Sequence, residues 1–447
     1  MMRKFKKYND YQESNIGWIG EIPSSWSLLR LGSVFNERRL KVSDKEFPPL
    51  SVTKNGIVAQ LETAAKSNDG DNRKGVLKGD FVINSRSDRK GSSGLAKNDG
   101  SVSLINIVIK PIKIVPQFSK YLLKSYSFIE EFYRNGHGIV ADLWTTKYSE
   151  MKGMLIPLPS KEEQSAIANF LDQKTTQIDH YIQLKEKTIA LLQERKAAII
   201  NQAVTKGLDP NVPMKDSGIE WLGEIPAHWE VKKLKYLSNL QSGLAIGPKN
   251  IEVNSKGIPY LRVANVQDGF LDLSLVKRIA VDKTTIKRYL LQKGDLLMNE
   301  GGDYDKLGRG YVWECEVDPC LHQNHVFAIR MYRNVDPYWI NYVTLTSYAK
   351  EYFKSKAKRT TNLASISSRN IKEFPVIFPP RKVQMEIIRT LKQKEFMLDE
   401  LVFKIQKEVS LIKEYRESLI SAAVTGKIDV RDYAEKQQLS YANTSDH

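Results

Sequence analysis

Two stretches of the chain place apolar residues at alternating spacings of three and four, with Lys, Glu and Gln between them. They are residues 159–205 and 379–425. This pattern is typical of a long helix that packs against another long helix. From Lys161 to Ala203 the first stretch has 43 residues, which at about 1.5 Å per residue corresponds to roughly 65 Å of helix. The pattern therefore predicts two rod-like helices.

The apolar positions of each stretch form one seam, which water would wet if the helix were alone. The first seam is Leu171, Ile178, Ile182, Ile189, Leu192, Ile199 and Ala203, and the second is Leu391, Leu398, Leu401, Ile405, Ile412, Leu419 and Ala422. Because both seams lie in one chain, we expect the two helices to bury them against each other. The pair would then act as a ruler between the parts that flank it. The outward polar face, with Lys185, Lys187 and Arg195, is a candidate docking surface.

The two stretches are also copies of each other. An offset of 220 residues aligns Pro159 with Pro379 and Gln164 with Gln384 without a gap. A second repeat, at an offset of 203, aligns the WxGEIPxxW sequences of residues 14–31 and 217–234. The chain therefore consists of two related halves, and the second half carries about 17 extra residues between its entrance turn and its long helix.

The region between entrance turn and long helix is mixed in each half. Short β-type runs are separated by Gly, Asn, Asp and Ser, as in GDFVIN and SLINIVIK, or GDLLMN and HVFAIRMY in the second half. A helix then follows a proline, at residues 116–134 and 337–356. We therefore predict an α+β protein with two pseudo-repeated globular domains and two long helices. The expected boundaries are a first domain at 1–158, a spacer helix at 159–207, a second domain at 208–378, a second spacer helix at 379–428 and a polar tail at 429–447.

Composition narrows the class of protein. A chain of 447 residues is too long for one hydrophobic core, and its net charge of +16 indicates a polyanionic ligand such as nucleic acid. The N-terminus lacks the apolar segment of a signal peptide, and no stretch is apolar enough to span a membrane. Only two cysteines are present. We expect a cytoplasmic protein without a disulfide framework.

Catalytic and metal-binding patterns are weak. Asp80, Asp88 and Lys90 resemble the acidic pair and lysine of Mg²⁺-dependent nucleases, but Asp88 falls in a loop and the second half lacks the lysine. Cys315, Cys320, His322 and His325 are too closely spaced for an ordinary zinc site. Phosphate loops, dinucleotide fingerprints and nucleophile elbows are missing from the sequence. We therefore expect a protein with no catalytic residue, no metal site and no cofactor of its own.

Basic and hydroxyl side chains gather in loops at equivalent places of the two halves, where they suit base edges and phosphates. One pair of loops follows the GD strands, and another precedes the long helices. The candidate DNA-binding residues are Arg86, Ser87, Arg89, Lys90, Ser92, Arg134, His137 and Lys147 in the first half, and Arg262, Asn265, Tyr304, Lys306, Arg309, Lys358, Arg359, Thr360 and Asn362 in the second.

Together, the duplicated entrances, GD strands, proline-led helix starts and paired heptad helices resemble the specificity subunit of type I restriction-modification systems. The resemblance extends from about Tyr8 to Asp429. It implies two target recognition domains separated by an antiparallel coiled coil, in a non-catalytic subunit that recognises a bipartite, asymmetric DNA target. The implied partners are double-stranded DNA, two methyltransferase subunits that use S-adenosylmethionine, and two restriction subunits that use ATP and Mg²⁺.

Two other classes of function remain open from the residues alone. One is a stand-alone Mg²⁺-dependent DNA nuclease using Asp80, Asp88 and Lys90. The other is a coiled-coil scaffold that binds nucleic acid or protein through its two globular parts.

Overall fold

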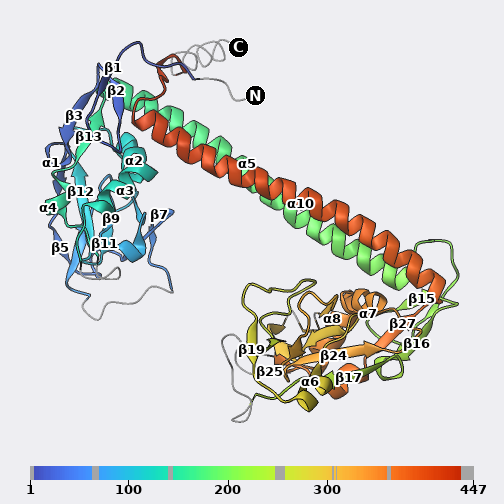
Figure 1. Cartoon of the computed structure of the whole chain (residues 1–447). Helices are drawn as coiled ribbons and strands as arrows, with labels where there is room; N and C mark the ends of the chain where they lie inside the picture. Colours follow the sequence, from blue (N-terminus) through green and yellow to red (C-terminus); the bar gives the residue numbers. More distant parts are fainter. Residues whose placement is uncertain are drawn as a thin grey trace. The chain divides into compact units, whose positions relative to one another are not determined.

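The computed structural model describes residues 5–62, 70–138, 144–246, 257–304, 307–308, 310–359 and 364–433 (Figure 1). Its internal contacts divide the chain into two compact units. Unit 1 comprises Met1–Glu186 and Gln406–His447, and unit 2 comprises Lys187–Ile405. Two long helices, α5 (Lys161–Lys206) and α10 (Arg381–Val424), each contribute one part to unit 1 and the other part to unit 2.

Unit 1 mixes short strands and helices. Its strands are β1 (Tyr11–Glu13), β2 (Glu21–Pro23), β3 (Ser27–Arg30), β4 (Phe35–Glu37), β5 (Lys41–Val42), β6 (Leu50–Thr53), β7 (Gly56–Ala59), β8 (Arg73–Val76), β9 (Phe81–Asn84), β10 (Ser93–Leu95), β11 (Gly100–Val102), β12 (Asn106–Pro111) and β13 (Leu155–Leu158). Its short helices are α1 (Leu31–Val34), η1 (Ser87–Arg89), α2 (Pro116–Lys124), α3 (Tyr126–Arg134) and α4 (Tyr148–Met151).

The centre of unit 1 is an antiparallel sheet with strand order β10-β9-β12-β4. β9 is buried along its whole length because it packs on both faces, which explains its continuous apolar run FVI. One face meets a core that includes α2 and α3, and the other meets a smaller cluster around Val82 and Val108. The smaller sheets are β11-β8-β5, β6-β7, β13-β3 and β1-β2.

Unit 2 has a corresponding set of elements. Its strands are β14 (Met214–Asp216), β15 (Glu224–Pro226), β16 (Glu230–Lys233), β17 (Ser238–Ser242), β18 (Ile258–Leu261), β19 (Lys277–Ile279), β20 (Leu296–Asn299), β21 (Gly301–Gly302), β22 (Gly310–Val312), β23 (Leu321–His322), β24 (Val326–Met331), β25 (Lys358–Arg359), β26 (Ala364–Ser365) and β27 (Pro375–Phe378). Its short helices are η3 (Leu234–Tyr236), α6 (Lys283–Tyr289), α7 (Pro337–Thr344), α8 (Ser347–Lys356) and α9 (Ser368–Lys372).

The central sheet of unit 2 has the strand order β22-β20-β24-β17. These strands come at the same points of the second half as β10, β9, β12 and β4 do in the first half, so the two central sheets have the same strand order. The β16-β27 and β14-β15 pairs likewise correspond to β13-β3 and β1-β2. A further sheet, β19-β18-β23, includes one parallel pair, between β18 and β23. The GD strands of both halves, predicted from sequence, are therefore confirmed as central strands β9 and β20.

The single helices predicted at 116–134 and 337–356 are wrong in detail, because each is two helices. Ser125 takes an extended conformation between α2 and α3, its buried hydroxyl donates to the Leu122 carbonyl at 2.8 Å, and it caps α3 by accepting from the Phe128 amide at 3.4 Å. Thr346 is likewise extended between α7 and α8 and donates to the Val343 carbonyl at 2.6 Å, but its side chain does not cap α8. Hydroxyl residues compete with the helix for backbone partners, which explains both breaks.

The starts of the long helices are built alike. Gln164 is buried in the first turn of α5, and its amide donates to the Pro159 carbonyl at 2.9 Å. Gln384 makes the same bond to Pro379 at 2.8 Å. The glutamine shared by the two copies therefore ties each helix to the proline-led segment before it. Gly207, at φ +82°, follows the end of α5.

Within unit 1, α5 and α10 run antiparallel. Asp179 pairs with Arg416 at 3.0 Å and Lys185 with Glu408 at 2.9 Å. The residue number of the partner on α10 therefore decreases as the residue number on α5 increases. Within unit 2, Lys196 pairs with Asp399 at 2.8 Å. These pairs are exposed or half-exposed, so their contribution to stability is small beside that of the apolar seam.

The predicted seam is partly correct. Leu171, Ile182, Leu391 and Ile405 are buried, as expected. The assignment of Leu401 to the second seam is wrong, because this residue is 45% exposed. Val402 and Val409 occupy the inward side instead, since the true register shifts by one position along this part of α10.

Lys124 generates a prediction about pH. Its ammonium donates to the carbonyls of Lys54 and Ser93 at 2.8 and 2.9 Å, which ties the end of α2 to the β6–β7 turn and to the start of β10. Burial lowers the pKa of Lys124 to about 8, from an ordinary 10.5. Between these values only the unfolded chain keeps the proton, so the contribution of Lys124 to folding stability rises as pH increases through this window.

We therefore expect the difference in urea midpoint between wild type and Lys124→Met to shift in favour of wild type from pH 7.5 to pH 9.5. Lys97→Met, at an exposed position, is the control and should show no such shift. A difference that is constant with pH would contradict the prediction.

Candidate nucleic-acid interface

The aspartates of the two GD turns are structural. Asp80 is almost fully buried, and its carboxylate accepts from Arg38 Nε at 2.5 Å and Nη2 at 2.9 Å. It also accepts from the Leu77 amide at 2.8 Å, which closes the turn. Asp295 has the same role in unit 2, with two bonds from Arg330 at 2.8 and 2.7 Å. The arginine comes from a different place in each unit, since Arg38 follows β4 and Arg330 lies in β24, although the aspartate is equivalent.

This geometry argues against a nuclease site. Asp80 precedes β9 and Asp88 follows it, so the four-residue strand, at about 3.3 Å per residue, separates them by roughly 13 Å. Lys90 is paired with Glu130 at 2.7 Å. The three groups therefore do not converge on one metal ion.

In unit 1 the two predicted binding loops meet. Thr145 forms backbone bridges with both Arg86 and His137. The Ser87 amide donates to the Trp144 carbonyl at 3.1 Å, and the Thr146 amide to the Ser85 carbonyl at 3.0 Å. Loops that are about 50 residues apart in sequence therefore form one irregular three-stranded ribbon, which we name ribbon 1 (residues 85–87, 137 and 144–146).

Ribbon 1 is fastened to α3. Thr146 donates through its hydroxyl to the Phe132 carbonyl at 2.9 Å, and the indole of Trp144 donates to the Tyr133 carbonyl at 2.7 Å. The Tyr133 hydroxyl in turn donates to the Asn84 carbonyl at 2.8 Å. These buried or half-buried bonds give the loop segments a defined position despite their irregular sequence.

Most candidate residues around ribbon 1 already have acidic neighbours. Arg89 lies 3.6 Å from Asp88, and Arg134 lies 3.3 Å from Glu131. His137 Nδ1 lies 3.9 Å from Glu150, a residue that also accepts from the Lys147 amide at 2.5 Å. The Lys147 side chain is exposed, whereas Ser92 is buried and lies away from the surface.

Unit 2 has a ribbon at the equivalent place. β21 pairs antiparallel with β26, and β26 with β25, so the Gly301–Gly302, Ala364–Ser365 and Lys358–Arg359 segments form three short strands. We name this ribbon 2. It is joined to β20 by a bond from the Ile366 amide to the Glu300 carbonyl at 2.7 Å.

Two candidates of unit 2 come together beside ribbon 2. The Arg359 guanidinium lies over the ring of Tyr304, with 4.1 Å from Cζ to the ring centroid. Lys358 is exposed next to it. Four other candidates, Lys306, Arg309, Thr360 and Asn362, lie outside the described residues.

Arg262 and Asn265 form a turn after β18. The buried Asn265 side chain accepts from the Arg262 amide at 2.9 Å and donates to the Asp272 carbonyl at 2.8 Å. Asn299, at the end of β20, donates to the carbonyls of Val263 and Val266 at 3.2 and 2.8 Å. Asn265 is thus engaged in holding the turn, while the half-buried Arg262 has a buried Nε with no hydrogen-bond partner among the described residues.

The cysteine and histidine cluster of unit 2 has local partners. His322 is buried, its Nδ1 lies 2.6 Å from the Val326 carbonyl, and burial lowers its pKa. His325 Nδ1 lies 2.6 Å from Glu300. In the described part of the chain, no three His, Cys, Asp or Glu residues are grouped as metal ligands would be.

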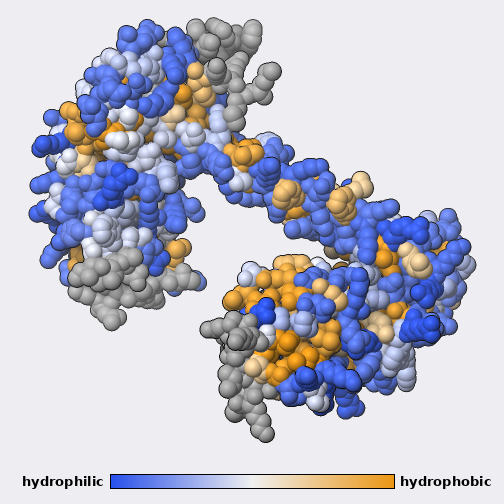
Figure 2. Space-filling view, in the orientation of Figure 1, coloured by the Kyte–Doolittle hydropathy of each residue, from blue (hydrophilic) through white to orange (hydrophobic). Residues whose placement is uncertain are grey.

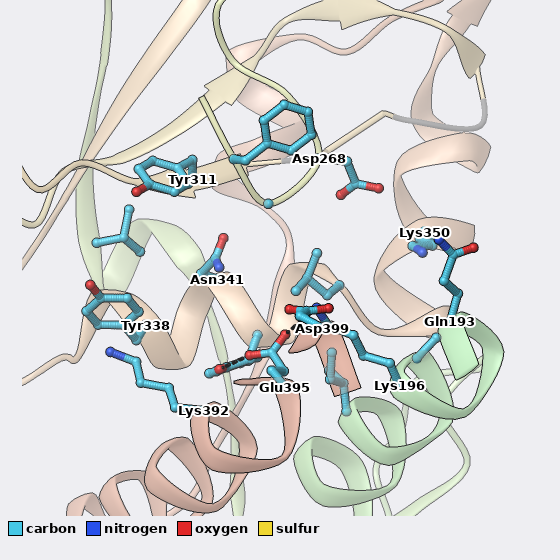
Figure 3. Close-up of a pocket in the computed structure, with 17 residues that line it drawn as sticks. Gln193, Lys196, Asp268, Tyr311, Tyr338, Asn341, Lys350, Lys392, Glu395 and Asp399 are labelled. Atoms are coloured by element: carbon cyan, nitrogen blue, oxygen red, sulfur yellow. Dashed lines mark hydrogen bonds and ion pairs between the residues drawn. The ribbon is translucent and has the colours of Figure 1, made fainter. Parts of the chain in front are cut away.

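A cavity of about 540 Å³ lies where α7 meets α5 and α10 within unit 2 (Figure 3). Lys196 pairs with Asp399 and Glu395 across it, and the Tyr342 hydroxyl donates to Glu395. Burial raises the pKa of Tyr342, so this hydroxyl keeps its proton. The contacts hold α7 against the two long helices, which is a structural role.

Two features were missed from the sequence. The first is the backbone pairing that merges the loops into ribbons, for which no local signal exists. The second is a row of exposed apolar residues on α10, notably Phe396 and Phe403, each 67% exposed. Their seven-residue spacing on the side opposite the seam was a signal that the heptad analysis passed over.

Comparison with known proteins places the chain near one family. A family model described as the type I restriction modification DNA specificity domain matches residues 226–410. The specificity subunit of the EcoKI type I restriction enzyme from Escherichia coli K12 is 25% identical over 64% of this chain and 60% of that protein. The MjaIX specificity subunit from Methanocaldococcus jannaschii is 24% identical over 96% of this chain and 99% of that protein.

The alignments with the first three curated relatives span 60%, 47% and 63% of those proteins, which is less than two-thirds of their length. Among solved structures, a chain from a type I R-M system described by its complex assembly and conformational transition has a TM-score of 0.68 at 16% identity. That match covers 90% of this chain and 98% of the other. It shows a shared mixed helix and strand fold. Along the described residues, no helix combines the length and apolar character needed to cross a membrane.

The role of Asp80 can be tested by substitution. We expect Asp80→Ala to lower the free energy of unfolding by about 3 to 5 kcal/mol, because Arg38 would keep a half-buried charge without its partner. Asp88→Ala, at an exposed position, should change it by less than about 0.5 kcal/mol. Thermal and urea unfolding of the two variants measure this. Mg²⁺-dependent DNA cleavage by the purified protein that disappears in Asp88→Ala would restore the nuclease hypothesis.

Proposed function

We propose that this chain, which is similar to the specificity proteins of type I restriction-modification systems, is the sequence-specific DNA-recognition subunit of such a complex. Units 1 and 2 are the two target recognition domains, and ribbons 1 and 2 are their DNA-facing elements. The observation that carries the proposal is the match of residues 226–410 to the DNA specificity domain. The basic balance of the chain, +16, supports a DNA ligand.

The target that we propose is bipartite and asymmetric. Both units have the same central strand order, and each merges two loops into a ribbon at the same place. The side chains of the ribbons differ, since ribbon 1 carries Arg86 and His137 where ribbon 2 carries Gly301 and Lys358. A common frame with different contact residues supports the recognition of two different half-sites.

Energetics favour two domains over one. Each base pair discriminates by about 1 to 3 kcal/mol, so a domain that contacts three or four pairs leaves many competing sites in a genome. Two recognition domains in one chain add their energies, because the second binding event becomes intramolecular. In this proposal α5 and α10 form the antiparallel coiled coil that sets the distance between half-sites.

The activity of the complex belongs to its partners in this proposal. Methyltransferase subunits supply adenine methylation with S-adenosylmethionine, and restriction subunits supply ATP- and Mg²⁺-dependent translocation and cleavage. The chain itself contributes recognition and positioning. No residue is assigned a catalytic role, and the tightly paired Asp80 supports this assignment.

The exposed apolar row of α10 supports a docking surface for a methyltransferase subunit. In the space-filling view, separate apolar patches interrupt the polar surface of the long helices (Figure 2). Phe396 and Phe403 lie on the side of α10 opposite the seam residues Leu391 and Leu398. Aromatic anchors of this kind commonly dominate protein interfaces. Lys185, the charged candidate from the sequence, is engaged with Glu408 at 2.9 Å and suits this role less well.

The function is tested by exchanging residues 32–155 for the corresponding segment of another specificity protein of this family. We expect one half of the methylated motif to change and the other half to remain, because ribbon 1 is replaced and ribbon 2 is kept. Sequencing that maps methylated adenines, in a host with the exchanged protein and its methyltransferase, gives the motif. Methylation at an unchanged motif would refute the proposal.

Docking is tested separately with Phe396→Gln combined with Phe403→Gln. Both side chains are exposed, so the fold should be unaffected, while loss of two anchors weakens assembly on the order of 30-fold or more. The amount of methyltransferase subunit recovered with the tagged protein is the measurement. Gln393→Ala on the same helix is the matched control. Full recovery with the double variant would exclude this surface.

A further inference from the structure

We propose that Arg359, held on the ring of Tyr304, recognises a guanine in the half-site contacted by unit 2. The inference rests on the proposed function and deepens it, since it assigns a base to one side chain.

The contact leaves the hydrogen-bonding edge of Arg359 available. Its Cζ lies 4.1 Å from the centre of the Tyr304 ring, while the side chain remains exposed. A guanidinium that stacks on an aromatic ring uses its flat face, so its N–H groups point outward in the plane. The ring thereby orders a long side chain before DNA arrives, and less rotamer entropy is lost on binding.

The charge of Arg359 is uncompensated in the described part of the chain, where no acidic residue pairs with it. A second cation, Lys354, lies 5.7 Å from the centre of the same ring and 3.9 Å from Glu351. Two candidate cations of unit 1 differ, because Arg89 and Lys90 have acidic partners at 3.6 and 2.7 Å. Unlike Arg89 and Lys90, Arg359 therefore does not have to break an ion pair within the described residues when it binds DNA.

The backbone around Arg359 suits a groove. Arg359 lies opposite Ala364 in the β25–β26 pair, and β21 beyond it consists of two glycines. The β25–β26 pair is a two-stranded part of ribbon 2, and the major groove of B-DNA admits an element of two strands. Small residues opposite the arginine keep this part of the ribbon thin, so that the guanidinium projects from it.

Guanine is the base that matches this group. Its O6 and N7 are two acceptors at the major-groove edge, spaced for two N–H donors of one guanidinium. A lysine keeps the charge but lacks the planar, fixed fork of donors, so it holds the paired contact less specifically. A phosphate accepts either residue, so Arg359→Lys separates a base contact from a backbone contact.

The experiment maps adenine methylation in a host that carries the full chain with its methyltransferase partner, using a plasmid library randomised at the half-site of unit 2. For Arg359→Lys we expect methylation of the original target to fall about 5- to 150-fold and one guanine position to accept other bases. Tyr304→Ala should act in the same direction to a smaller degree, and Tyr304→Phe should resemble wild type because it keeps the ring.

The matched control is Lys358→Gln, at the neighbouring exposed position. It should lower methylation evenly over all sequences, as expected for a phosphate contact, without relaxing any base. A midpoint of thermal unfolding equal to that of the wild type establishes that each variant folds.

The inference is wrong if Arg359→Lys leaves the motif intact, whether methylation is unchanged or evenly reduced. Exchange of residues 208–378 separates this failure from failure of the proposed function. If that exchange replaces a half-site while Arg359→Lys relaxes none, only the role of Arg359 is refuted. If the exchange itself leaves the motif unchanged, unit 2 does not recognise DNA sequence.

Discussion

The burial of long-helix ends in the two cores is the constraint on which the rest of the structure depends. The core of unit 1 includes Leu171 from the start of α5 and Ile420 and Val424 from the end of α10. The core of unit 2 includes Val204 from the end of α5 and Leu391 from the start of α10. Each unit therefore needs one helix start and one helix end, because without them its apolar face would be open to water.

A frame anchored in this way tolerates different contact surfaces. The Asp80–Arg38 and Asp295–Arg330 pairs hold equivalent turns, although Arg38 follows β4 and Arg330 lies in β24. Both ribbons are fastened to the frame by hydrogen bonds of backbone and hydroxyl groups, so their outward side chains carry little of the folding energy. Such a division allows the contact residues to differ between units while the fold stays the same.

Much of the fold was predictable because its signals are local or periodic. The two long helices, their shared Gln164 and Gln384 and the central GD strands follow from hydrophobic period and internal repetition. The helix breaks at Ser125 and Thr346 were missed, since a hydroxyl residue does not by itself stop a helix. The candidate DNA-binding residues stay a prediction, and the structure shows only where their side chains lie. Asn265 and Ser92 have side chains suited to DNA but are buried by contacts that the sequence does not reveal.

The sequence by itself determined the two long helices, the central GD strands and the basic composition of the loops, because apolar spacing and charge are properties of the chain alone. Only the tertiary structure decided which loop residues remain available. Arg86, His137 and Thr145 meet through backbone bridges, and Arg359 lies on Tyr304, across separations of many residues. Such pairings depend on how the strands align in space. Residue type therefore predicts the chemistry of a loop, while packing decides which side chain can use it.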